Sequence, residues 1–140
     1  MSDDRTVLIV DDDEMVREGM CRLIEAGGFH CIIAEHALQA LAMLAESRAR
    51  VVLADYDMPG MDGVEFLREV AVRHPSVIRI LVTGRKDAEP AVRAINEAHA
   101  YQYLSKPCKG ADLRSALQLA FQAASALAEV RRLQAERART

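Results

Sequence analysis

The sequence predicts an α/β protein in which a five-stranded, doubly wound parallel sheet carries helices on both faces. Short apolar runs alternate with longer segments of helical periodicity along the whole chain, which is the pattern of consecutive βαβ units. One run, VVLA at residues 51–54, is apolar at every position, as expected of a strand buried on both faces of a parallel sheet. We expect right-handed crossovers, the strand order 2-1-3-4-5 and five helices.

The first two βα units are predicted within residues 6–47. TVLIV at 6–10 and FHCIIA at 29–34 are the expected strands. Between them, helical spacing begins at Glu14 and stops at Gly27-Gly28. Its expected apolar positions are Met15, Val16, Met20, Leu23 and Ile24. The Ala- and Leu-rich segment 36–47 favours a second helix, with Leu38, Leu41, Ala42 and Leu44 on its apolar side.

The remaining units follow the same alternation. Residues 51–54 form the third expected strand, and 64–74 form a helix that ends before Pro75. VIRILVT at 77–83 is the fourth strand. A helix is expected from Asp87, an acid suited to capping, with Pro90 in its first turn, where a missing N–H costs little. AYQYLSKP at 100–107 is the fifth strand, and everything from about residue 111 onward predicts one long helix.

Composition narrows the class of protein. The 140 residues correspond to about one domain with a formal net charge of −3, so no global charge favours nucleic acid or an anionic membrane as a partner. The longest apolar runs are far too short to span a membrane. The three cysteines are odd in number without a C-x-x-C motif, and the four histidines lack metal-ligand spacing. We therefore expect a reduced, cytoplasmic protein without disulfides or a zinc site.

Polar residues gather where the predicted strands end. Asp11 and Asp12 follow the first strand, Asp55 the third, Thr83 ends the fourth, and Lys106 follows the fifth. In the order 2-1-3-4-5 these ends are neighbours, so the side chains should converge outside the carboxyl ends of the strands. Clustered carboxylates favour raised pKa values or a bound cation. Oxygen ligands without His or Cys point to Mg²⁺, or Mn²⁺, and to phosphoryl transfer.

Four motifs occurring in order resemble one known family. VLIVDDD, VVLADYDMPGMDG, LVTG and YLSKP together are similar to the response-regulator receiver domain, the phosphorylatable module of two-component signalling. The resemblance covers residues 5 to about 122. It implies the flavodoxin-like fold already expected, and a sensor histidine kinase as partner.

The resemblance also implies roles for the acids. Asp55 would be the phosphoacceptor, whose carboxylate attacks the phosphorus of a phosphohistidine to form an acyl phosphate. Asp12 would bind Mg²⁺ directly, with Asp11 acting partly through water. Asp55 itself and the backbone carbonyl of Asp57 would complete the protein ligands. Asp13 is interpreted instead as a first-turn acid of the following helix.

Four residues near the last two strands receive roles by the same resemblance. Thr83 would hydrogen-bond one phosphoryl oxygen, and Lys106 would pair with another. The bond before Pro107 would be cis and would aim Lys106 inward. Tyr103 would act with Thr83 as a switch, its ring swinging inward as Thr83 moves toward the phosphoryl group. Gly63 is expected to permit a close turn into the next helix.

Two further features bear on the roles that the resemblance implies. Cys108 stands where many relatives carry a large aromatic or aliphatic residue, so the packing behind the lysine is in question. Asp57 and Arg85 lie two residues beyond Asp55 and Thr83, at positions that tune water access in the family. We hypothesise that Asp57 and Arg85 form an ion pair that slows hydrolysis of the acyl phosphate.

The last helix suggests a second segment. We expect a receiver domain at 1–122 and an extended helix at 123–140, because a thirty-residue helix would be about 45 Å long and would outrun the sheet. Its projecting half is interpreted as a coiled-coil linker or, equally, as a frayed solvated tail. The chain stops without a cap, so we expect an N-terminal piece of a larger protein. Its output domain would be of the cyclic-diguanylate phosphodiesterase or transcription-regulator type.

Three functions from different classes fit these observations. The leading one is a signalling module, not a turnover enzyme, in which phosphorylation changes the face formed by the fourth helix, fifth strand and fifth helix. Homodimers are expected through that face or through the last helix. The second is a haloacid-dehalogenase-like phosphatase with Asp55 as nucleophile, although that nucleophile usually ends the first strand. The third is a phosphorylation-independent receiver scaffold.

Overall fold

The computed structural model describes residues 5–84, 86 and 88–139, which form strands and helices in strict alternation. The strands are β1 (Thr6–Val10), β2 (His30–Ala34), β3 (Val51–Asp55), β4 (Ile78–Thr83) and β5 (Gln102–Ser105). The helices are α1 (Glu14–Ala26), α2 (Ala37–Glu46), α3 (Gly63–Arg73), α4 (Glu89–Ala98) and α5 (Gly110–Arg139). The five strands are parallel in the order β2-β1-β3-β4-β5, so the predicted fold class is confirmed.

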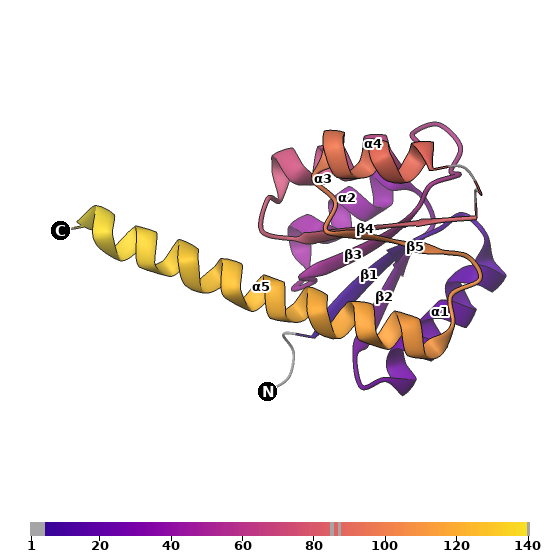
Figure 1. Ribbon diagram of the computed structural model, residues 1–140, viewed down its shortest axis with the longest axis horizontal. Coiled ribbons are helices and arrows are strands. Elements are labelled where there is room, and N and C mark those ends of the chain that lie inside the picture. The colour runs from indigo at the N-terminus through magenta and orange to yellow at the C-terminus, as the bar shows by residue number, and fades with distance from the viewer. Residues whose placement is uncertain (1–4, 85, 87, 140) are drawn as a thin grey trace.

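Helices lie on both faces of the sheet (Figure 1), and the sheet separates two layers of buried apolar side chains. Side chains alternate along each strand, so in β1 Leu8 and Val10 join the layer under α2, α3 and α4. Val7 and Ile9 point the other way, into the layer that contains residues of α1 and α5. The residues of β3 divide in the same manner. Both faces of the central strands are therefore buried, which explains why VVLA contains no polar residue.

One predicted helix face is rotated by about one residue. In α2, Leu38 is 72% exposed and Ala42 is also exposed, although both were expected on the apolar side. The buried positions are instead Ala37, Ala40, Leu41 and Leu44. The predicted and observed faces share Leu41 and Leu44, and helical spacing alone does not separate them. Small alanines at 37 and 40 let the helix lie close to the sheet. In α1, Met15 and Leu23 are likewise exposed, whereas Met20 and Ile24 are buried.

The helix starts differ in part from expectation. Asp13 is the N-cap of α1 and not a first-turn residue, because its carboxylate accepts from the N–H groups of Met15 at 3.0 Å and Val16 at 3.2 Å. A capping box between Asp62 and Glu65 starts α3. That box was not predicted, although the D-x-x-E spacing is present. Asp87, expected to cap α4, lies outside the described residues.

The turn from β3 into α3 needs a glycine. A Cβ at Gly63 would lie 2.4 Å from the carbonyl oxygen of Asp55 and 2.8 Å from the Cα of Tyr56. The Gly63 N–H also donates to the Tyr56 carbonyl at 2.9 Å. This close approach confirms the expected turn, and it ties the start of α3 to the residue that β3 delivers at its end.

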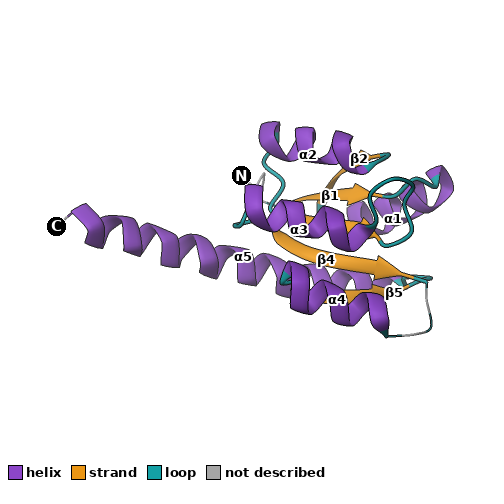
Figure 2. Ribbon diagram, turned by 90° about the horizontal axis from the view of Figure 1, so that it is seen from above, coloured by secondary structure: helices purple, strands orange, loops and turns teal. Residues whose placement is uncertain are grey.

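Only the first half of α5 packs on the domain. Its buried residues run from Leu113 to Ala124, and residues 128–139 are all exposed. Figures 1 and 2 show the second half projecting away from the sheet as one continuous helix. The helix α5 continues to Arg139. The boundary at 122 and the coiled-coil linker stay predictions.

Among the helices the structure describes, none is long and apolar enough to cross a membrane.

Replacing Gly63 tests the close turn directly. We expect Gly63→Ala to lower the free energy of unfolding by at least about 2 kcal/mol, because the new methyl group meets rigid backbone. Urea unfolding measures this change. Gly19→Ala is the matched control, since a Cβ there meets no atom within 4 Å and alanine stabilises a helix interior by about 0.5–1 kcal/mol. Equal stabilities of the two variants would contradict the account of this turn.

Candidate functional site

The strand ends bring together four of the predicted site residues. Asp11 follows β1, Asp55 ends β3, Thr83 ends β4 and Lys106 follows β5. Because β1, β3, β4 and β5 are neighbours in the parallel sheet, these side chains lie at the same edge. Asp11 and Asp55 are only 2% and 5% exposed, and Thr83 is also buried. Polar groups are expensive to bury without partners, so their contacts decide what the site can do.

Three carboxylates form a cluster at this edge. Asp11, Asp12 and Asp55 each offer one oxygen atom, and these atoms all lie within 4.8 Å of one another. Asp12 is exposed, whereas the other two acids are buried. The cluster therefore opens to solvent on the side of Asp12.

Lys106 bridges the two buried acids. Its Nζ lies 2.8 Å from Asp55 Oδ1 and 3.1 Å from Asp11 Oδ2. The backbone N–H of Lys106 donates to the carbonyl of Thr83 at 2.9 Å, which ties the lysine to the end of β4. The Lys106–Pro107 bond is cis, as the resemblance implied. One ammonium group thus neutralises part of the charge of two carboxylates.

Electrostatics distinguishes Asp55 from an ordinary acid. Burial is the largest cause and raises the pKa of Asp55 from its usual 3.8 to about 6. The hydrogen bond from Lys106 works in the opposite direction, while the charges of Asp11 and Asp57 add to the increase. For Lys106, burial alone would lower the pKa, yet the contacts with Asp55 and Asp11 outweigh it and raise the pKa. The ionised carboxylate of Asp55 is therefore less stable in this site than an ordinary carboxylate in water.

Arg17 is a site residue that the sequence interpretation missed. Its side chain is 7% exposed, and its Nη1 donates to the carbonyl oxygen of Asp11 at 2.8 Å. Within the described residues its buried Nε has no hydrogen-bond partner. Asp11 Oδ1 also accepts from the N–H of Asp13 at 2.9 Å, so the turn carrying the acids is held on both sides. The available signal was spacing, because Arg17 shares the buried face of α1 with Met20 and Ile24.

Three other predicted residues lie nearby without joining the cluster. Asp57 is exposed, and its carboxylate is not among the three clustered acids of the described chain. Tyr103 on β5 is 47% exposed, with its ring outside the core. Cys108 is half-buried and its Sγ lies 3.7 Å from the carbonyl of Ser105. Arg85, the proposed partner of Asp57, lies outside the described residues.

The donor set fits a hard divalent cation. Mg²⁺ prefers carboxylate oxygens and keeps several waters, and the cluster offers three carboxylates with one side open to solvent. The raised pKa of Asp55 adds a second observation, because a buried acid beside another acid gains from additional positive charge. Lys106 supplies one such charge. Three carboxylates against one ammonium leave a net negative charge, which a divalent cation would reduce.

Comparisons with known proteins agree with this geometry. A family profile described as "Response regulator receiver domain" matches residues 7–118. The chain is 36% identical over 137 residues to the hydrogenase transcriptional regulatory protein HoxA of Cupriavidus necator, covering 97% of this chain and 28% of that protein. It is 34% identical over 102 residues to a cyclic di-GMP phosphodiesterase of Thermotoga maritima, covering 73% of this chain and 27% of the relative.

A solved structure gives the same result. The signal receiver domain of an HD domain-containing protein from Pseudomonas fluorescens Pf-5 matches with a TM-score of 0.82 and 33% identity, covering 86% of this chain and 97% of that one. The chain thus matches nearly the whole of a receiver domain. It spans little more than a quarter of the two longer relatives.

Removing the charge of Asp55 should stabilise the metal-free protein at neutral pH. A folded-state pKa of about 6 against an ordinary 3.8 means that ionised Asp55 costs up to about 3 kcal/mol above pH 6. We expect Asp55→Asn to gain about 1–3 kcal/mol at pH 7.5, because the neutral amide avoids the cost of an ionised carboxylate in this buried position. Below about pH 3 the wild-type carboxyl is protonated in both the folded and the unfolded state, so the gain should vanish.

Urea unfolding in EDTA at several pH values measures this difference. Glu18→Gln, at an exposed position of α1, is the matched control and should leave stability unchanged within about 0.5 kcal/mol. A loss of stability in Asp55→Asn at pH 7.5 would show that the carboxylate is well accommodated and that its burial is not costly.

Proposed function

Because the chain belongs to the response regulator receiver domain family, we propose that it accepts a phosphoryl group from a sensor histidine kinase onto Asp55. Receiver domains of this family are signalling modules of two-component systems and not turnover enzymes. The observation that carries the proposal is the bridge from Lys106 to Asp55 and Asp11 within a carboxylate cluster. An isolated buried aspartate would need no such arrangement.

The proposed reaction is a phosphoryl transfer between side chains. One carboxylate oxygen of Asp55 attacks the phosphorus of a phosphohistidine, a P–O bond forms and the P–N bond breaks. The leaving imidazole takes the electron pair and then a proton from solvent. Lys106, already 2.8 Å from Asp55, would pair with one phosphoryl oxygen, and the Thr83 hydroxyl would bind another. The protein contributes position and charge, which dominate catalysis of phosphoryl transfer.

We further propose that Asp11, Asp12, Asp55 and the carbonyl of Asp57 hold Mg²⁺, with Mn²⁺ as a substitute. When bound, the ion would neutralise charge on the carboxylates and on the phosphoryl oxygens. Arg17 would hold the turn of Asp11 and Asp12 in position through the Asp11 carbonyl, 2.8 Å from its Nη1. The three-carboxylate donor set supports this assignment.

Phosphorylation would act through Thr83 and Tyr103. These residues lie on the neighbouring strands β4 and β5, and the half-exposed ring of Tyr103 would move inward when Thr83 shifts toward a phosphoryl group. The change would favour an active conformation that exists already at low population. It would alter the face formed by α4, β5 and α5, which we propose as a docking or dimerisation surface.

The relatives suggest what the module controls. One relative is a transcriptional regulatory protein and another is a cyclic di-GMP phosphodiesterase, so we propose an output of one of these two types, joined through α5. A homodimer through the projecting half of α5 would couple two such outputs. We place the module in the cytoplasm, where its three free cysteines would stay reduced.

Acetyl phosphate with Mg²⁺ tests the proposal on the protein alone. Intact-mass measurement should show the mass of one added phosphoryl group, and borohydride trapping with peptide mapping should place it on Asp55. Asp55→Asn should remain unlabelled, whereas Asp57→Asn should still be labelled. Repeated turnover of a small phosphate ester would favour the phosphatase instead. Absence of any label, with partner binding unchanged in Asp55→Asn, would favour the scaffold.

Mg²⁺ should stabilise the folded protein by binding only to it. At a concentration one hundred times the dissociation constant the gain is about 2.7 kcal/mol, measured as a rise in the unfolding midpoint over an EDTA control. Asp12→Asn should remove most of this gain, because Asp12 is one of the proposed Mg²⁺ ligands and lies on the exposed side of the cluster. Glu18→Gln should retain it. An equal response of the wild type and Asp12→Asn would exclude the proposed metal site.

A further inference from the structure

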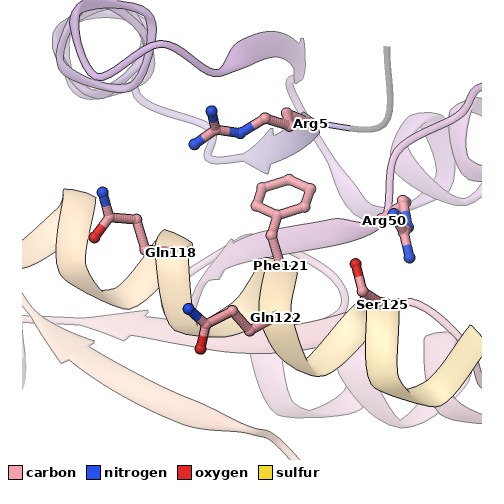
Figure 3. Close-up of a pocket in the computed structure, with 6 residues that line it drawn as sticks. All are labelled: Arg5, Arg50, Gln118, Phe121, Gln122 and Ser125. Atoms are coloured by element: carbon pink, nitrogen blue, oxygen red, sulfur yellow. The ribbon is translucent and has the colours of Figure 1, made fainter. Parts of the chain in front are cut away.

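A cavity lies at the opposite end of the sheet from the carboxylate cluster. It has a volume of about 550 Å³ and is lined by Arg5, Arg50, Gln118, Phe121, Gln122 and Ser125 (Figure 3). Arg5 immediately precedes β1 and Arg50 immediately precedes β3, while the other four residues belong to α5. Since a five-residue strand is about 16 Å long, the cavity is remote from Asp55 and has no part in the proposed phosphoryl transfer.

Among the residues that the structure describes, the charge of the cavity lining is positive. These lining residues include two arginines and no acid, and within the described chain neither guanidinium has a carboxylate partner. By contrast, Arg68, Arg73 and Arg132 each pair with a glutamate. Two cations that share a cavity whose described lining supplies no counter-charge attract anions to it.

Both arginines are attached to rigid backbone. The carbonyl of Arg5 accepts from the N–H of His30 at 2.9 Å. The N–H of Arg50 donates to Thr6 at 3.1 Å, and its carbonyl accepts from Ile78 at 2.9 Å. The carbonyl groups of both arginines and the N–H of Arg50 are therefore engaged, and the side chains project from fixed positions at the start of the sheet.

The side chain of Arg5 is also positioned by an aromatic pair. Its guanidinium carbon lies 4.2 Å from the centre of the Phe29 ring, and Phe29 stacks on Phe121 with 5.5 Å between ring centres. Such cation–π contact holds the guanidinium close to the protein. Part of the entropy cost of binding an anion has therefore been met before the ligand arrives.

Helix α5 adds uncharged hydrogen-bonding groups to the cavity. Gln118, Gln122 and Ser125 are spaced by four and three residues and so share one face of the helix. In the view of Figure 3, Gln118 lies on the side of Arg5 and Ser125 on the side of Arg50, with the Phe121 ring between the arginines. The cavity thus combines two separated cations, an aromatic floor and amide and hydroxyl groups.

We propose that this cavity binds a phosphorylated small molecule of nucleotide size. Guanidinium groups bind phosphate oxygens in bidentate geometry, and the volume lies within the range of small-molecule sites. An acidic peptide is less suited, because β1 and β3 are inner strands of the sheet whose backbone groups here are engaged. Strand addition therefore has no free edge at this place.

Because of where the cavity lies, a bound ligand would affect the projecting half of α5. The residues from α5 that line it end at Ser125, where burial of the helix also ends. A ligand held between the arginines and this face would fasten α5 to the start of the sheet just before the helix projects. This inference does not depend on phosphorylation of Asp55.

Isothermal titration with AMP, GMP and adenosine tests the proposal on the whole chain. A mononucleotide should bind and adenosine should not, because the phosphate supplies the contact with the arginines. Arg5→Gln and Arg50→Gln should each weaken binding at least tenfold. Arg73→Gln is the matched control, since Arg73 lies on α3 and pairs with Glu69, and it should bind as the wild type does.

A second pair of changes guards against unfolding of the arginine variants. Gln118 and Gln122 are exposed, so the double variant Gln118→Ala/Gln122→Ala should remain folded, and it should also bind more weakly. Absence of binding by both mononucleotides at millimolar concentration would overturn the proposal. So would equal affinity in the arginine variants, or binding of a hexaglutamate peptide in place of the mononucleotides.

Discussion

The arrangement at the carboxyl end of the sheet depends on one ammonium group shared by two buried carboxylates. Lys106 Nζ lies 2.8 Å from Asp55 and 3.1 Å from Asp11, and within the described residues it is the cation that forms ion pairs with both buried carboxylates. The strands β1, β3 and β5 each supply one member of this contact. Strand order, the length of each strand and the close turn at Gly63 therefore all serve to place three side chains within hydrogen-bond distance.

The compensation by Lys106 is incomplete, and we propose that the remaining cost of ionised Asp55 favours its reaction with a phosphoryl group. Burial still raises the pKa of Asp55 to about 6, which means that the ionised nucleophile is less stable than an ordinary carboxylate. A cation beside it, or conversion into an acyl phosphate whose charge Lys106 and Thr83 can reach, would relieve that cost. Stability is thus given up at the position where chemistry is proposed.

Much of this fold and site was accessible from the sequence, for identifiable reasons. Runs such as VVLA fix a strand buried on both faces, and acids or lysine directly after such runs fix where the polar groups gather. Features without a local signal were less accessible. The face of α2 was misplaced because Leu38 and Ala37 fit nearly the same periodicity, and tertiary packing decided between them. The role of Arg17 depends on a contact with the Asp11 carbonyl, and the arginine cavity depends on segments distant in sequence.

The pKa of Asp55 is the most direct measure of the central claim. Carbon-detected NMR of the side-chain carboxyl, followed from pH 3 to pH 8 in EDTA and again in Mg²⁺, reports it without any substitution. The account predicts a midpoint near 6 in EDTA and a clearly lower one in Mg²⁺. A midpoint near the ordinary 3.8 that does not respond to Mg²⁺ would contradict it.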